Sequence, residues 1–201
     1  MKKKSLVIAV ALVAILAIGL VVTIAYFTDK KDVTNTFTVG NLKIDLTEPN
    51  FPEAPPKLLP GTEIPKDPTV KLLAGSEDAY VFMQLKPEGR IMDFLKPISI
   101  NSNWIPVTGG SNLYVYATGD PRTPAVVTAG TVLPALFDKV EVIADLDNRI
   151  FEGYEVEGGD DVPAFDPLVD KLTINAFAHQ AYVNGVLSYT IAEDAAKVQL
   201  P

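Results

Sequence analysis

Any catalysis by this chain that needs a histidine would have to use His179, because it is the only histidine, and there is no cysteine. The lack of cysteine excludes thiolate nucleophiles, cysteine-ligated zinc and disulfide bonds. Catalytic zinc usually takes two or three histidines, and no H-E-x-x-H motif is present. A serine triad would again require His179, and no G-x-S-x-G turn accompanies it. We therefore predict no catalytic residues and a protein that is not an enzyme.

Carboxylates are the other groups that could do chemistry, and they gather in two polar loops. The candidates are Asp145, Asp147 and Glu152 in one loop, and Asp160 and Asp161 in the other. Oxygen-rich loops of this kind can bind calcium without an EF-hand, although loop acids are more often plain solvated surface. No spacing marks a pair of carboxylates for glycoside hydrolysis. Calcium is the one cofactor that the sequence suggests, and no other is expected.

The N-terminus has the pattern of an export signal. Lys2, Lys3 and Lys4 precede an uncharged apolar run from Leu6 to Val22, which Thr23-Ile24-Ala25 closes. A basic start, an apolar middle and small residues at the end predict cleavage between Ala25 and Tyr26. The run is long for a cleaved signal, so the alternative is a retained hydrophobic helix that anchors the protein. In both cases the rest of the chain lies outside the cell.

The net charge of the chain limits the classes of molecule that it could bind. The formal net charge is −8, and residues 1–25 hold three lysines and no acid, so the exported part is more acidic still. Nucleic-acid binding depends on cationic contacts to phosphate, and docking on anionic lipids needs basic residues. We therefore exclude nucleic acid, and expect membrane contact only through residues 1–25 before cleavage.

The remaining chain alternates apolar and polar residues with a period of two, which predicts β-strands. Strands are expected within 33–46, with a change of phase at Gly40-Asn41, and at 69–73, 79–86, 98–100, 104–107, 113–118, 139–143 and 171–183. Helical structure is expected as a turn at 91–95 and a surface helix at 191–198, while 132–137 could be a helix start or an edge strand. Seven prolines make 49–68 a connector, and 144–170 is acidic and irregular.

Short strands joined by Pro/Gly-rich turns predict an all-β fold. The specific expectation is an antiparallel, jelly-roll-like β-sandwich with a few short helices, preceded by an N-terminal hydrophobic signal helix. The domains are then a signal peptide over 1–25, an N-terminal strand segment over 26–48 and a β-sandwich domain over 49–201.

Three segments of the chain resemble one protein family when they are taken together and in order. They are AYFTDKKDVTNTFTVGNLKIDLTEP (residues 25–49), LLPGTEIPKDPTVKLLAGSEDAYVFMQL (58–85) and LTINAFAHQAYV (172–183). In this order they are similar to the TasA/camelysin family, exported proteins of Gram-positive bacteria that the signal peptidase SipW processes. The stretch from about Pro87 to Asp170 carries no part of the resemblance.

The resemblance implies a secreted structural subunit of extracellular biofilm matrix fibres. In such fibres the N-terminal segment of one subunit adds as a donor strand to the sheet of the next. The partners implied are further copies of the chain in a head-to-tail homopolymer, the signal peptidase and other matrix proteins. The apolar residues expected to insert are Phe27, Phe37, Val39, Leu42, Ile44 and Leu46.

Three alternatives remain beside the fibre subunit. The alternating segment could be an ordinary first strand of its own domain, because alternation predicts a strand and not its neighbour. The protein could be a monomeric, membrane-anchored binding or adhesion module on the cell surface. Finally, the camelysin branch implies a metalloprotease, and the single histidine argues against that activity.

Overall fold

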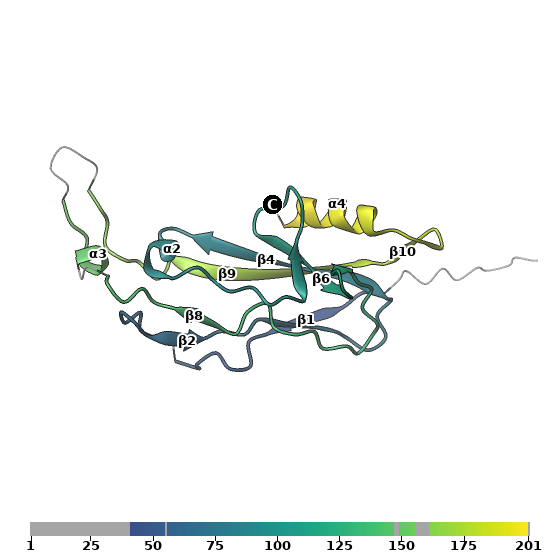
Figure 1. Cartoon of the computed structure of the whole chain (residues 1–201), viewed down its shortest axis with the longest axis horizontal. Helices are drawn as coiled ribbons and strands as arrows, with labels where there is room; N and C mark the ends of the chain where they lie inside the picture. The colour runs from purple at the N-terminus through teal and green to yellow at the C-terminus, as the bar shows by residue number, and fades with distance from the viewer. Residues whose placement is uncertain (1–40, 55, 147–148, 156–160, 201) are drawn as a thin grey trace, which may run out of the picture. The chain divides into compact units, whose positions relative to one another are not determined.

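Antiparallel strands dominate the part of the chain that the computed structural model describes, which is residues 41–54, 56–146, 149–155 and 161–200. Every strand pairing in this part is antiparallel, which confirms the all-β expectation (Figure 1). Residues 40–201 form one compact unit. The predicted signal helix lies outside the described residues.

The strands are β1 (Ile44–Thr47), β2 (Glu63–Pro65), β3 (Thr69–Leu72), β4 (Ala79–Glu88), β5 (Trp104–Pro106), β6 (Leu113–Thr118), β7 (Thr123–Pro124), β8 (Lys139–Glu141), β9 (Lys171–Gln180), β10 (Tyr182–Val183) and β11 (Val186–Leu187). The helices are α2 (Ile91–Phe94), α3 (Arg149–Glu152) and α4 (Tyr189–Gln199). The largest sheet has the order β5-β6-β4-β9, with β7 beside β6, and the pairs β1-β3, β2-β8 and β10-β11 are separate.

Strand β4 is central to the largest sheet and is covered on both faces. Val81, Met83 and Leu85 face one apolar cluster together with residues of β2, β3 and β8. Tyr80 and Phe82 face a second cluster together with α4. Burial on both faces explains why the sequence of β4 is continuously apolar rather than alternating.

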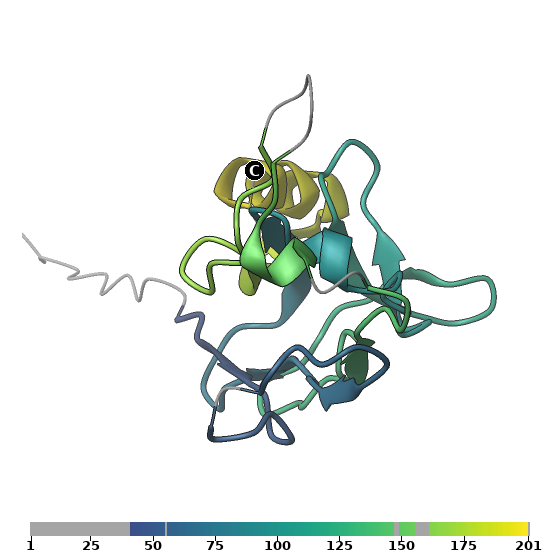
Figure 2. The ribbon, with the colours of Figure 1, turned by 90° about the vertical axis from the view of Figure 1, so that its left-hand side faces the viewer.

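The two clusters separate three layers. Helix α4 lies on one side of the largest sheet, and the β1-β3 and β2-β8 pairs lie on the other (Figures 1 and 2). Helix α4 approaches the sheet closely because the residues that it buries there, Ala192 and Ala196, are small and one turn apart. Tyr189 at its start packs edge-on against Tyr80, with ring centroids 5.3 Å apart.

Three expectations about secondary structure need correction. Residues 98–100 are not a strand; Ile98 and Ile100 instead pack as partly buried side chains against the larger cluster. The proline-rich connector contains β2, where Pro65 is tolerated because the strand has one partner only, β8. The acidic stretch 144–170 contains the short helix α3.

The connector before β3 is held in place by a buried carboxylate. Asp67 accepts hydrogen bonds from the backbone N–H of Asn50 at 2.8 Å and from its side-chain amide at 2.7 Å. Lys66 beside it pairs with Glu48 at 2.6 Å. These contacts join the two ends of the connector and fix its path.

A second buried carboxylate joins the end of β4 to the start of β9. Asp170 accepts hydrogen bonds from the N–H of Arg90 at 2.7 Å and from the N–H of Asp166 at 2.9 Å. Gly89 lies against it with φ of +58°. A Cβ at Gly89 would overlap Asp170 and lie 2.9 Å from the carbonyl oxygen of Val169.

The close packing at Gly89 predicts an unequal effect of two alanine substitutions. Gly75 also has positive φ, at +79°, but a Cβ added there would meet no other atom within 4 Å. Gly75→Ala should therefore lower the free energy of unfolding by about 1 kcal/mol, the cost of a left-handed residue with a Cβ. Gly89→Ala should lower it by a further ~1–3 kcal/mol because of the overlap. Urea unfolding measures both, and equal losses would contradict a closely packed Asp170 junction.

Candidate functional site

The outer edge of β9 is the candidate site. Among the described strands, β9 pairs with β4 alone, through a register that runs from Ala79↔Gln180 to Glu88↔Lys171. Its opposite edge therefore presents main-chain donors and acceptors without a strand beside them. At ten residues it is as long as β4.

The direction of each main-chain group of β9 follows from the alternation of an antiparallel ladder. Ala79 exchanges hydrogen bonds with Val127, so its main-chain groups point away from β9. Its partner Gln180 is then a non-hydrogen-bonded residue of the β4-β9 ladder, and every second residue shares this state. The outward-pointing N–H and C=O groups belong to Leu172, Ile174, Ala176, Ala178 and Gln180.

This edge lacks the usual protection against strand addition. Natural edge strands are kept short, or carry charges, prolines or bulges. From Leu172 to Gln180 there is no charged residue and no proline. The side chains of Leu172, Ile174, Ala176 and Ala178 are half-buried and pack against the larger core cluster. An added strand would therefore find both main-chain partners and an apolar face beside it.

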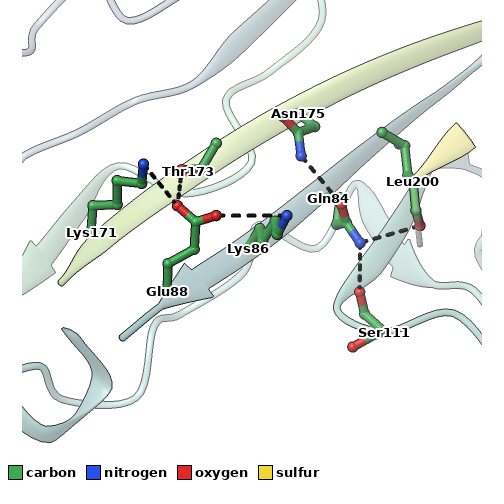
Figure 3. Close-up of polar contacts among 8 residues, drawn as sticks. All are labelled: Gln84, Lys86, Glu88, Ser111, Lys171, Thr173, Asn175 and Leu200. Atoms are coloured by element: carbon green, nitrogen blue, oxygen red, sulfur yellow. Dashed lines mark hydrogen bonds and ion pairs between the residues drawn. The ribbon is translucent and has the colours of Figure 1, made fainter. Parts of the chain in front are cut away.

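The other face of β9 carries polar contacts that fix its register on β4 (Figure 3). The Asn175 side-chain amide donates to Gln84 Oε1 at 3.3 Å. Gln84 is buried, and its Nε2 donates to the carbonyl oxygen of Leu200 at 3.2 Å, just beyond α4. The same side chain thus ties the edge strand, the central strand and the C-terminal helix together.

Glu88 of β4 likewise forms side-chain contacts with β9, at the start of that strand (Figure 3). Its carboxylate lies 3.3 Å from Lys171 Nζ and accepts a hydrogen bond from Thr173 at 3.2 Å. The hydrogen bond from Lys171 is the main reason why the pKa of Glu88 lies below its ordinary value. The pairing is solvated, so its contribution to stability is small.

An apolar groove lies at the Leu172 end of β9. Its volume is about 440 Å³. The apolar side chains that line it include Leu58, Ile64, Ile91, Leu95, Phe151, Phe165 and Leu172. Lys57, Lys66 and Lys171 stand at the groove together with Asp170. Lys66 and Lys171 are paired with Glu48 and Glu88, whereas Lys57 has no ion pair within the described residues.

The Gln180 end of β9 is different. A hollow of about 540 Å³ is lined there by Ser76, Glu77, Asp78, Gln180 and Tyr182. The N–H of Glu77 donates to the carbonyl oxygen of Asn41 at 2.9 Å, and the N–H of Lys43 donates to Ser76 Oγ at 3.0 Å. The chain that precedes Asn41 therefore joins the domain at the acidic end of β9, opposite to the apolar groove.

The predicted inserting residues fall into two groups. Phe27, Phe37 and Val39 lie outside the described residues, as do Ala25 and Tyr26 of the predicted cleavage site. Leu42, Ile44 and Leu46 lie within the domain: Ile44 and Leu46 belong to β1 and pair with Leu72 and Val70 of β3. Leu42 and Ile44 also pack against the larger core cluster. A strand free for donation is thus limited to the residues before Asn41.

The calcium candidates within the described residues are not brought together. Asp145, Glu152 and Asp161 are exposed, and no group of three or more acidic or histidine side chains converges in the described residues. Asp147 and Asp160 lie outside those residues. His179 is half-buried on the polar face of β9, with Nδ1 2.9 Å from the carbonyl oxygen of Gln180.

Comparison with known proteins gave no match to a family model, a curated protein or a solved structure. No helix in the described part of the chain is both long and apolar enough to cross a membrane.

The buried amide of Gln84 predicts which polar contact matters most for β9. Gln84→Ala leaves the Leu200 carbonyl and the Asn175 amide without their partner, and should lower the free energy of unfolding by about 2–3 kcal/mol. Asn175→Ala removes one 3.3 Å contact and should cost about 1 kcal/mol or less. Urea unfolding compares the two variants. A larger loss for Asn175→Ala would contradict the central role of Gln84.

Proposed function

We propose that this protein is a secreted structural subunit of extracellular fibres, and that it polymerises when residues 26–40 of one copy add as a strand to β9 of the next. The observation that carries the proposal is the unprotected outer edge of β9, ten residues long and without charge or proline beyond Lys171. The setting, a biofilm matrix on a Gram-positive-type bacterium, comes from the TasA/camelysin resemblance. The jelly-roll description belongs to the same proposal, and the antiparallel strands on both sides of the larger core cluster support it.

Strand addition at β9 would supply hydrogen-bond partners for its outward main-chain groups and would cover its half-buried apolar side chains. Each main-chain hydrogen bond adds a net contribution of about 0.5–1.5 kcal/mol. The alternate apolar side chains of the donor would cover Leu172, Ile174, Ala176 and Ala178, which sets the register. Edge β1 is a weaker acceptor, because it is four residues long and three of those are exposed.

The ends of β9 give the donor a direction. Residues 26–40 span about 50 Å when extended, against about 33 Å for β9, at roughly 3.3 Å per residue. The donor segment joins its own domain at the Gln180 end. In a head-to-tail fibre it would enter the next copy at the Leu172 end and run antiparallel to β9. Within its own domain it could cover β9 only as a parallel strand, unless a long loop intervened.

A head-to-tail contact uses two different surfaces, so it repeats into a filament when the rotation does not close. The chain has no cysteine to stabilise it outside the cell, and assembly would supply that stability instead. Cleavage after Ala25 would release the donor strand. The signal peptide would then both direct export and prevent assembly until it is removed.

A proline in β9 tests the acceptor edge. The N–H of Ala176 points outward, so Ala176→Pro removes a donor from the edge and leaves the β4 ladder intact. Ala176→Ser keeps the N–H and serves as the matched control. We expect both variants to unfold at similar urea concentrations, and only the serine variant to form filaments in electron micrographs. Filaments of normal length from Ala176→Pro would contradict strand addition at this edge.

The N-terminus of the secreted form separates the fibre subunit from the anchored module. We expect N-terminal sequencing to start at Tyr26, and a chain that starts at Asn41 to stay monomeric with its fold intact. That truncation spares Leu42, Ile44 and Leu46, which belong to the domain. Secreted protein that keeps residues 1–25, or filaments formed by the truncated chain, would contradict strand donation.

A further inference from the structure

An exposed apolar patch lies next to the end of β9 where the donor segment joins the domain. The hairpin of β10 and β11 pairs Tyr182 with Leu187 and turns through Asn184 and Gly185, both with positive φ. The patch comprises the exposed side chains of Tyr182 and Leu187 on one face of the hairpin, of Val186 (66% exposed) on its other face, and of Ile191 on α4. We call it the hairpin patch. The part of the chain that the structure describes leaves these side chains exposed, and clusters of exposed apolar residues mark interaction sites.

The apolar groove at the Leu172 end of β9 is concave, unlike the hairpin patch. It is a hollow lined largely by apolar side chains, whereas the hairpin that carries the patch extends beyond the end of β9 (Figure 1). The two features stand at opposite ends of β9, because the groove includes Lys171 and Leu172 while β10 begins two residues after Gln180. The strand between them spans about 33 Å, so the hairpin patch cannot fill the groove of its own domain.

Charge also distinguishes the two ends. Tyr182 of the hairpin patch lines the hollow that contains Glu77 and Asp78. Neither carboxylate forms an ion pair with a described residue, and neither does Lys57 beside the groove. An unpaired cation at one end and two unpaired acids at the other are complementary between copies. Complementary charges set the register and the on-rate of such a contact more than its strength.

We infer that successive subunits also meet through a second contact, in which the hairpin patch of one copy sits in the apolar groove of the next. This inference rests on the head-to-tail assembly proposed above. The donor segment and the hairpin patch leave the domain at the same end, so one neighbour receives both. Glu77 and Asp78 then approach Lys57 of that neighbour. The contact would close the groove and hold the donor strand at the end where it enters β9.

The lack of native cysteine gives a direct test of this contact. The secreted protein would carry Lys57→Cys in the groove and Val186→Cys in the hairpin patch. The two positions lie too far apart for a disulfide within one chain, which needs Cα atoms within about 7 Å. The matched control pairs Lys57→Cys with Val198→Cys, since Val198 is 75% exposed on α4, away from the hairpin patch. Oxidation followed by denaturing gels would show covalent dimers and longer ladders.

We expect about tenfold or more ladder from the Val186 pair than from the control, because a held contact raises the effective concentration of the two thiols. Electron micrographs of the same preparation report filaments independently. Filaments without preferential linkage of the Val186 pair would overturn the hairpin contact and keep strand donation. Linked dimers without filaments would keep the hairpin contact and contradict the proposed function. Equal linkage of both pairs would also overturn the contact.

A second variant does not depend on cysteine chemistry. Leu187 is 50% exposed, so Leu187→Lys should leave the monomer's unfolding unchanged. We expect it to raise the critical concentration for assembly by about tenfold, which corresponds to about 1.4 kcal/mol. Val198→Lys is the control and should leave that concentration unchanged. An unchanged value for Leu187→Lys would overturn the contact.

Discussion

The ten-residue antiparallel pairing of β4 with β9 is the interaction on which the rest of this structure depends. One edge of β4 also pairs with β6, and its two faces contact the two core clusters. Asp170 at one end, and Gln84 in the middle, tie this pair to the loops and to the end of α4. The same pairing leaves β9 at the edge of the sheet. Strand β9 is therefore held by β4 on one side and has no described strand on the other, which is the state that strand addition requires.

The two ends of the β9 edge differ from each other. The apolar groove lies at Leu172, and the acidic hollow, the hairpin patch and the entry of the N-terminal chain lie at Gln180. A surface with unlike ends favours a head-to-tail arrangement, because each end complements the other and not itself. Strand donation and the hairpin contact would then act together between the same two copies. Their free energies would add where the sites are independent and couple where Leu172 contributes to both.

Sequence alone was sufficient for the elements with strong local signals. The alternation in residues 171–183 predicted a strand where β9 lies, and the surface helix predicted at 191–198 corresponds to α4. Residues 98–100 were predicted wrongly, since two isoleucines around one serine pack into a core equally well from an irregular segment. Strand β2 was missed among prolines, because its one partner, β8, lies far along the chain. The edge position of β9 and its groove depend on such long-range neighbours, which alternation does not specify.

Hydrogen exchange at the backbone of β9 tests strand addition most directly, because adjacent amides of one strand point to opposite sides. In the monomer, the amides of Thr173, Asn175 and Phe177 face β4 and should be protected, while those of Ile174, Ala176 and Ala178 should exchange quickly. In assembled filaments the account predicts that the second set becomes protected as well. Rapid exchange of Ile174, Ala176 and Ala178 in filaments would show that no strand covers β9, and would contradict the account.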